Sequence, residues 1–257
     1  MLGQVVETLV DADLGAGAVN STASRGGVSA TFTRATAAAA KLSTGLWKLD
    51  VASGTARYSY NGATTAVTTT GGYFAEGART QLTVNPRDMT QAEWVAVNVT
   101  PVKNAVGIDG VSNSACTLTS AAIGASILQT LVAAASSRTY SIWLRRVSGT
   151  GTITISQGAT TLEVTASLNS ATYTRVELAA AVLNSAYGIT FGASGDVVVA
   201  DQNQFEAGAF ASSPIPVAAV TRNADVLTYP TTGWFNAAAG TLFGQFLFPS
   251  VAADVNG

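Results

Sequence analysis

Three carboxylates in the second half of the chain are the residues most suggestive of catalysis. Asp196, Asp201 and Glu206 lie along one predicted strand and at its ends. Glycoside hydrolysis needs two carboxyl groups that face one sugar, ~5–9.5 Å apart. Successive side chains of a strand point to opposite faces, so Asp201 and Glu206 should point in opposite directions unless a bulge intervenes. The sequence therefore predicts no catalytic residue, and a protein that is not an enzyme.

The composition removes the commonest catalytic and metal chemistries. The chain contains no His, which excludes nucleophiles activated by His and the commonest zinc ligand. Its single cysteine, Cys116, allows neither an internal disulfide nor an all-Cys metal site. Oxygen atoms of Asp109, Asp196 or Asp201 could hold a structural calcium ion, but the chain has no dense Asp/Asn loop. We therefore expect no cofactor and no metal, with structural calcium as the open alternative.

Two pairs of oppositely charged residues could serve either ligand binding or structure. Glu76 and Arg79 lie close together in a Gly/Ala-rich segment, and Glu206 and Arg222 form the second pair. A buried arginine can donate several hydrogen bonds to loop carbonyls, whereas a half-satisfied buried charge is costly. We interpret both pairs as structural ion pairs that hold connections against the β domain.

Aromatic side chains supply the candidates for glycan binding, because their rings suit the C–H faces of sugars. Tyr140, Ile142 and Leu144 share one face of a predicted strand. Trp143 and Arg145 therefore lie on the opposite face, either lining the sheet surface or buried between subunits. The alternative for each tryptophan is a place in the core of the β domain. The candidates for a glycan site are Trp94, Trp143, Arg145 and Tyr187.

Charge is scarce in this chain. Charged residues make up 11% of the 257 residues, against about 25% in a typical soluble domain. The net charge of −2 provides no basic surface for phosphate backbones, so we expect no nucleic-acid partner. No apolar stretch reaches the ~18–20 residues that span a bilayer, and the start lacks a basic signal-peptide segment, so we expect no membrane insertion. The low charge predicts that part of the surface is buried against other copies or other proteins.

The elements that would position these residues are strands. Short runs rich in Val, Ile, Thr and Tyr, separated by Gly, Ser and Asn, predict an all-β protein. Strands at a spacing of roughly 8–12 residues predict a jelly-roll β-sandwich, which we place over residues 93–218. The turn from Ser148 to Gly151 has the signature of a hairpin. Val197–Ala200 reads as a strand covered on both faces.

Three regions flank the predicted sandwich. Residues 1–25 are predicted to form an N-terminal arm that orders on a partner, and residues 26–92 a β-rich docking region. Two prolines that cannot donate to a central ladder mark the other boundary, after which residues 219–257 form a linker and the start of a C-terminal β domain. The apolar strand over 240–248 would invite aggregation if exposed, so it should pair with another subunit or lead into a further domain.

Five motifs follow one another along the chain. They are Phe32–Thr36, Ala56–Gly62 with Gly72–Leu82, Tyr140–Arg146, Gln204–Gly208 with Ser212–Pro216, and Thr221–Asp225. Their order and spacing resemble those of bacteriophage virion structural proteins of the tail-fibre, tailspike and head-decoration type. In that group an N-terminal β region precedes a carbohydrate-binding-module-like jelly roll. The chain departs from the pattern at Tyr73, Phe74 and Ala75, where aliphatic residues are usual, and at Gln81, which replaces Asn.

The resemblance implies a fibre or spike subunit that docks on the particle and presents β domains to host-surface polysaccharide. It also implies a homotrimer, contacts with other virion proteins of the capsid, portal or tail, a place on the virion surface, and synthesis in the bacterial host cytoplasm. The C-terminal β domain would then be lectin-like. Two alternatives are a capsid (head) decoration protein that stabilises the shell without binding sugar, and the N-terminal part of a tailspike depolymerase. The resemblance supplies no catalytic residue.

Overall fold

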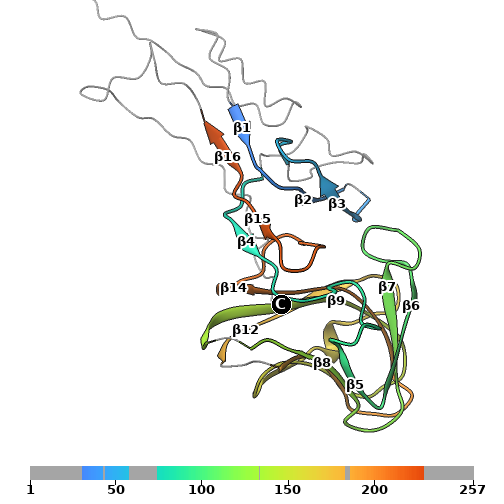
Figure 1. Ribbon diagram of the computed structural model, residues 1–257. Coiled ribbons are helices and arrows are strands. Elements are labelled where there is room, and N and C mark those ends of the chain that lie inside the picture. The colour runs from blue at the N-terminus through green and yellow to red at the C-terminus, as the bar shows by residue number, and fades with distance from the viewer. Residues whose placement is uncertain (1–30, 43, 58–73, 133, 183–185, 229–257) are drawn as a thin grey trace, which may run out of the picture.

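The protein is an all-β sandwich, as the sequence predicts (Figure 1). The computed structural model describes residues 31–42, 44–57, 74–132, 134–182 and 186–228. The predicted arm at 1–25 and the apolar strand at 240–248 lie outside this part of the chain. Within it, the only helical element is a single 3₁₀ turn, η1 (Thr165–Ser167).

Two five-stranded antiparallel sheets form the sandwich. One sheet has the order β11 (Thr160–Glu163), β10 (Ile153–Gln157), β13 (Ala186–Phe191), β8 (Ser126–Thr130) and β5 (Val95–Val97). The other has the order β12 (Thr174–Val182), β9 (Ser136–Ser148), β14 (Val197–Ala207), β7 (Ala115–Ser120) and β6 (Val99–Ala105). We call them the β13 sheet and the β9 sheet. The chain crosses repeatedly from one to the other, which gives the jelly-roll type of connection.

One crossing shows how a single residue moves the chain between sheets. β5 belongs to the β13 sheet and β6 to the β9 sheet, and only Asn98 separates them. Asn98 has a left-handed backbone with φ of 54°, a conformation that asparagine tolerates better than most residues. The chain turns there without a loop and connects the edge strand of one sheet directly to the edge strand of the other.

The core lies between the two sheets and follows strand alternation. Tyr140, Ile142 and Leu144 of β9 are fully buried and face inward, as predicted. Tyr187 of β13 stacks on Phe205 of β14, with ring centroids 4.3 Å apart. Such ring pairs contribute about 0.5–1.5 kcal/mol beyond the area they bury. The inward side chains therefore fix the register of both sheets, and the residues between them are presented on the outer faces.

The turn at Ser148–Gly151 does not close a hairpin, so this prediction is wrong. β9 and β10 on either side of it belong to different sheets. The turn wraps around Asp196, whose Oδ1 accepts hydrogen bonds from Arg146 Nη2 at 2.6 Å and Gly151 N at 3.1 Å. This buried carboxylate directs the chain around the corner, a long-range effect that local turn chemistry does not reveal.

Three two-stranded ladders extend from one end of the sandwich. They are β1 (Thr31–Thr33) with β16 (Val226–Thr228), β2 (Ala38–Lys41) with β3 (Trp47–Val51), and β4 (Arg79–Thr80) with β15 (Thr221–Arg222). β1 and β16 are antiparallel, with Phe32 opposite Leu227. The N-terminal and C-terminal segments of the described chain therefore lie side by side (Figure 1). We call this region the junction.

Candidate functional site: a junction cluster and an outer aromatic face

A buried carboxylate, Asp225, ties together three segments that are distant in sequence. Its Oδ1 accepts a hydrogen bond from Arg34 Nη1 at 2.7 Å, and its Oδ2 accepts one from Arg57 Nη2. The backbone N–H of Glu76 also donates to Asp225 Oδ2, at 3.0 Å. The side chains of Arg34, Arg57 and Asp225 are all fully buried. Both carboxylate oxygens are thus paired, which a buried charge requires.

Glu76 is the second carboxylate of the junction. Its Oε2 lies 3.0 Å from Arg57 Nη1 and 3.5 Å from Arg222 Nη1. Ser213 donates to Glu76 twice, from its backbone N at 2.8 Å and its Oγ at 2.5 Å. We call Arg34, Arg57, Glu76, Ser213, Arg222 and Asp225 the junction cluster.

The four predicted ion-pair residues form ion pairs, but with exchanged partners. Glu76 pairs with Arg222, whereas Arg79 Nε lies 3.9 Å from Glu206 Oε2. Arg79 and Arg222 are directly opposite each other in the ladder of β4 and β15. Like charges that face each other across strands are destabilising, and here each guanidinium has a different carboxylate. The partners of Glu76 and Arg79 therefore follow from the register of β4 against β15 and not from their proximity in the sequence.

The charged surroundings shift the pKa values of both cluster carboxyls. Burial alone would raise the pKa of Glu76, but the Ser213 hydrogen bonds and the charges of Arg222 and Arg57 lower it below its ordinary value. Burial would likewise raise the pKa of Asp225, but hydrogen bonds from Arg57 and Arg34 and the charge of Arg57 lower it below its ordinary value. Both groups are therefore carboxylates at neutral pH.

A bulge in β14 changes the geometry of the two carboxylates considered for catalysis. The register of β14 against β9 shifts between Asp201 and Gln204, so Asp201 lies opposite Trp143 and Glu206 opposite Thr139. One extra residue brings Asp201 and Glu206 to the same face of the sheet, the exception that alternation allows. The positive φ of 49° at Gln202 accompanies this bulge.

Both of these carboxylates are occupied by protein donors. Asp201 accepts two hydrogen bonds from Arg87, each at 2.8 Å, and another from Ile108 N at 2.8 Å. Glu206 is fully buried and accepts from Ser212 N at 2.6 Å and Ser212 Oγ at 2.7 Å. These bonds anchor loops onto the outer face of the β9 sheet. Asp201 and Glu206 therefore have structural roles.

The carboxylates considered for calcium are also paired with arginines. Asp196 Oδ1 lies 2.6 Å from Arg146 Nη2, and Asp109 Oδ2 lies 2.6 Å from Arg87 Nη1. Among the described residues, no group of three or more His, Cys, Asp or Glu side chains is arranged to hold a metal ion. The expectation that the protein uses no cofactor stays a prediction from the sequence.

Trp143 and Arg145 lie on the outer face of the β9 sheet, opposite to the inward residues of β9. Trp143 is partly buried and meets Trp47 of β3 edge-on, with ring centroids 5.8 Å apart. The guanidinium of Arg175 lies 5.9 Å from the Trp143 ring, and that of Arg145 lies 5.8 Å from the Tyr173 ring. We call Trp47, Trp143, Arg145, Tyr173 and Arg175 the outer aromatic face. Its alternation of rings and guanidinium planes offers both stacking surfaces and hydrogen-bond donors.

Trp94 and Tyr187 do not share this face, which corrects their assignment to a glycan site. Trp94 is 4% exposed and Tyr187 is fully buried. Trp94 donates through Nε1 to the carbonyl of Asn85 at 3.2 Å, and Tyr187 donates through its hydroxyl to Gln129 Oε1 at 2.6 Å. Both rings fill the core with their polar atoms satisfied, so neither is available to a ligand. Large aromatics in sandwiches often have this role, which sequence alternation alone does not distinguish.

Several residues of the site were not singled out by the sequence. Arg34, Arg57 and Asp225 lie inside the motifs. The signal that could have found the two arginines is that each is the one charged residue of its segment, Phe32–Thr36 or Ala56–Gly62, in a chain where charge is scarce. Tyr173 had no such signal, because it belongs to a loop whose position depends on β12. The structure describes no helix long and apolar enough to cross a membrane in the residues it covers.

Comparison with solved structures gives likenesses to β domains of low sequence identity. The xylan-binding CBM22-1 domain of Paenibacillus barcinonensis Xyn10C is 10% identical with a TM-score of 0.40, and the match covers 54% of this chain and 100% of that domain. The CBM6cm-2 module of Cellvibrio mixtus lichenase 5A, in complex with cellotriose, is 11% identical with a TM-score of 0.30, covering 50% of this chain and 98% of that module.

A phage protein is also among the matches. The enzymatically active domain of tailspike protein 4 of bacteriophage CBA120 is 14% identical with a TM-score of 0.33. That match covers 49% of this chain and 21% of the tailspike chain. No protein-family model matches the chain, and neither does any curated protein. At these identities the likenesses concern the fold of the sandwich alone.

Proposed function

We propose that this protein is a bacteriophage virion structural protein, a fibre or spike subunit that docks on the particle and presents its sandwich to host-surface glycan. The proposal includes assembly as a homotrimer, contacts with other virion proteins, and a place on the virion surface after synthesis in the bacterial cytoplasm. It includes neither an enzymatic activity nor a resident cofactor.

The observation that carries the proposal is that the phage-like motifs meet in space. The first, second, fourth and fifth motifs supply all members of the junction cluster: Arg34, Arg57, Glu76, Ser213, Arg222 and Asp225. Gln81, the one polar departure from the pattern, is fully buried and donates to the carbonyls of Asn203 and Ile215. Motifs that together build one buried network support an architecture in common with phage virion proteins better than separate short matches do.

The attachment of the sandwich at one end supports a role in which the sandwich is presented to a partner. β1 and β16 pair at the junction, so both connecting segments leave the sandwich from the same end (Figure 1). The cluster fixes these segments to the base of the sandwich through fully buried ion pairs. A domain held at one end leaves its other surfaces available to a partner. This arrangement suits a module that projects from an assembly.

The outer aromatic face supplies the glycan contact in this proposal. The Trp143 ring would stack on a sugar ring, and Arg145 would donate hydrogen bonds to its hydroxyl groups. Asp201 and Glu206 serve the fold through their hydrogen bonds, which favours binding over hydrolysis. Incubation with host capsule should therefore produce no increase in reducing ends.

Retention of purified protein on immobilised host-surface polysaccharide tests this contact. Trp143→Ala and Arg145→Ala should each weaken binding about tenfold or more, because truncating a central Trp or Arg anchor costs about 2 kcal/mol or more. Lys48→Ala is the control, since Lys48 is an exposed cation that pairs with the exposed Asp50. Wild-type retention by both outer-face variants, with circular dichroism unchanged, would contradict the assignment of this face.

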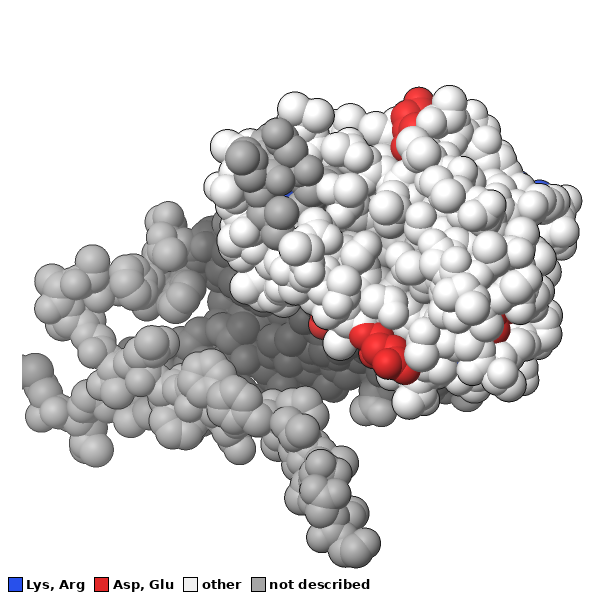
Figure 2. Space-filling view, turned by 90° about the horizontal axis from the view of Figure 1, so that it is seen from below, with Lys and Arg blue, Asp and Glu red and all other residues white. Residues whose placement is uncertain are grey.

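A capsid decoration protein is the second candidate, favoured by the outer face of the β13 sheet. Figure 2, which views the molecule from the side of β8 and β5, shows a broad surface where charged side chains are sparse. Val95 is 62% exposed and Val97 is 52% exposed on this sheet. A sheet surface with few charges and exposed valines suits packing on a protein shell. Val97→Glu should then abolish binding to particles, whereas the fibre proposal predicts that this variant still binds host polysaccharide.

A further inference from the structure

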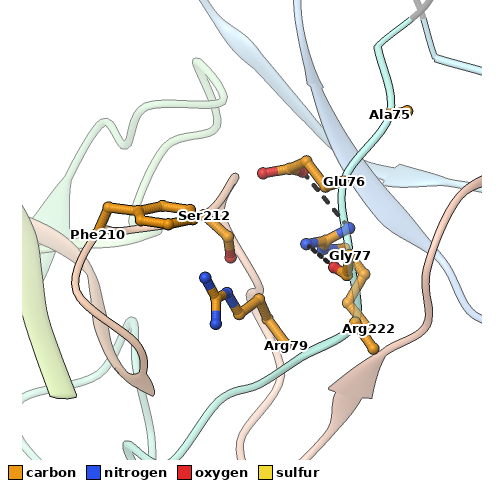
Figure 3. A pocket seen from close by; sticks show the side chains of 8 residues that line it. Ala75, Glu76, Gly77, Arg79, Phe210, Ser212 and Arg222 are labelled. Atoms are coloured by element: carbon orange, nitrogen blue, oxygen red, sulfur yellow. Dashed lines mark hydrogen bonds and ion pairs between the residues drawn. The ribbon is translucent and has the colours of Figure 1, made fainter. Parts of the chain in front are cut away.

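A pocket opens at the junction, apart from the outer aromatic face. It has a volume of about 380 Å³ and lies between β4, β15 and the loop that follows β14. Its lining includes Glu76, Gly77, Arg79, Phe210, Ser212 and Arg222. Figure 3 shows the guanidinium of Arg79 and the carboxylate of Glu76 reaching into the space beside the Phe210 ring.

Positive charge exceeds negative charge around the pocket. Its lining contains two arginines, Arg79 and Arg222, and one carboxylate, Glu76. The ion pairs at the junction involve four arginines, Arg34, Arg57, Arg79 and Arg222, and three carboxylates, Glu76, Glu206 and Asp225. Arg175 and Glu177 lie nearby and have opposite charges, so they do not change the difference between positive and negative charges. The formal charges of these ion-paired residues therefore sum to +1.

Arg222 retains unused donors next to the pocket. Its side chain is 1% exposed, and its Nη2 donates to the carbonyl of Gly77 at 2.9 Å. Its Nε and Nη1 have no hydrogen-bond acceptor, since the Glu76 and Asp225 oxygens lie 3.5 and 3.7 Å from Nη1. A buried donor without an acceptor costs about 1–3 kcal/mol. An anion in the pocket would lower this cost by bringing negative charge and acceptor oxygens near Arg222.

An exposed aromatic ring forms the other wall. Phe210 is 63% exposed, and among the described residues the other aromatic side chains are buried or half-buried. The Arg79 guanidinium lies 4.8 Å from the centroid of the Phe210 ring. Arg79 is also held by the hydrogen bond from its Nη1 to the carbonyl of Ala207, at 2.8 Å. A ring and a guanidinium are thus presented together at the mouth of a cationic pocket.

We propose that this pocket binds the carboxylate of an acidic sugar, such as a uronic acid unit of a polysaccharide. Arg79 contacts the carboxylate and Arg222 contributes charge from behind. The Phe210 ring packs on the C–H face of the sugar, and Glu76 accepts a hydrogen bond from a hydroxyl group. The choice of a sugar as the carrier of the carboxylate rests on the proposed glycan attachment.

Titration calorimetry of the whole protein with D-glucuronate, methyl glucoside and acetate tests the pocket. Glucuronate should bind at least tenfold more tightly than either the neutral sugar or acetate, because only glucuronate supplies both the carboxylate and the ring. Raising the salt concentration should weaken the binding. Phe210→Ala should reduce glucuronate affinity about tenfold, since it removes the stacking surface.

A second variant blocks the pocket without removing an interaction. A Cβ at Gly77 would meet no atom within 4 Å, so Gly77→Leu should fold normally and fill the space. This variant should abolish glucuronate binding. Ile123→Ala, which removes an 80% exposed apolar side chain from the loop between β7 and β8, is the control and should bind as wild type does.

The outcomes separate this inference from the proposed function. Equal affinity for acetate and glucuronate, or glucuronate binding that Gly77→Leu leaves intact, would overturn the acidic-sugar pocket. Absence of saturable glucuronate binding by the wild type would also overturn it. Host-cell binding measured in parallel reports on glycan attachment itself. Cell binding without glucuronate binding would contradict the pocket alone, whereas glucuronate binding without any cell binding would contradict the proposed function.

Discussion

Asp225 is the residue on which the junction depends most. Its side chain is fully buried, and it accepts hydrogen bonds from Arg34, Arg57 and the backbone of Glu76. These partners belong to segments separated from it by more than a hundred residues of sequence. Removing one member of a buried network leaves its partners as uncompensated buried charges. The stability of the junction should therefore respond strongly to a single atom change at this position.

Asp225→Asn should destabilise the protein by about 3–5 kcal/mol, the usual cost of breaking a buried ion pair. Hydrogen exchange of the β1 and β16 amides should accelerate, while that of central strand β9 changes less. Asp50→Asn is the matched control, because Asp50 is 82% exposed and pairs with an exposed lysine. Exposed pairs contribute about 0–1 kcal/mol. Equal effects of the two substitutions in chemical denaturation would contradict a central role for Asp225.

The same cluster should make stability depend on pH. The pKa values of Glu76 and Asp225 are lower in the folded protein than their ordinary values. Folding therefore favours the ionised form, and this stabilisation is present above the ordinary carboxyl pKa of about 4. It is lost as the pH falls through the lower folded values. The free energy of unfolding should decrease between pH 6 and pH 3, and Asp225→Asn should flatten that decrease.

At the residue scale the sequence identified the charged residues but not their partners. Glu76, Arg79, Glu206 and Arg222 are all paired, as predicted, yet Glu76 pairs with Arg222 and Arg79 with Glu206. Which guanidinium reaches which carboxylate depends on the register of β4 against β15, a contact between segments far apart in the chain. Phe210 carried no sequence signal, because its exposure follows from the path of a loop.

At the element scale, two irregular features of strands position the charged side chains. The bulge in β14 brings Asp201 and Glu206 to one face, where they anchor loops. The corner between β9 and β10 turns around Asp196. Strand alternation predicted the inward residues of β9 and the covered strand at Val197–Ala200. Bulges and corners escape such reasoning because each depends on a partner strand or a distant carboxylate.

Gly149→Ala tests the corner. Gly149 has φ of 93°, and a Cβ there would lie 1.9 Å from Asp196 Oδ1, so the turn or the carboxylate must move. Gly195→Ala is the control, because its φ of 81° is similar but its Cβ would meet no atom within 4 Å. The control should cost only backbone strain, about 1–2 kcal/mol. Gly149→Ala should lower the thermal midpoint further than Gly195→Ala, and equal midpoints would contradict the role of Asp196.

At the scale of the whole molecule, the protein is a sandwich held at one end by a charged junction. The ladder of β1 and β16 places both connecting segments together (Figure 1). The outer aromatic face, the junction pocket and the sparsely charged outer face of the β13 sheet have no residue in common. Their chemistry favours different partners, namely neutral glycan, acidic sugar and protein. A binding measurement on the intact protein can therefore distinguish the functions proposed for them.

The most direct measurement is a paired binding assay of labelled protein, against intact host cells and against particles that lack this protein. A fibre or spike subunit should bind both, and the host's own surface polysaccharide should compete for the cells. Trp143→Ala should reduce binding to cells and leave binding to particles unchanged. Binding to particles alone, with no polysaccharide-competed binding to cells, would contradict glycan attachment and favour a decoration protein.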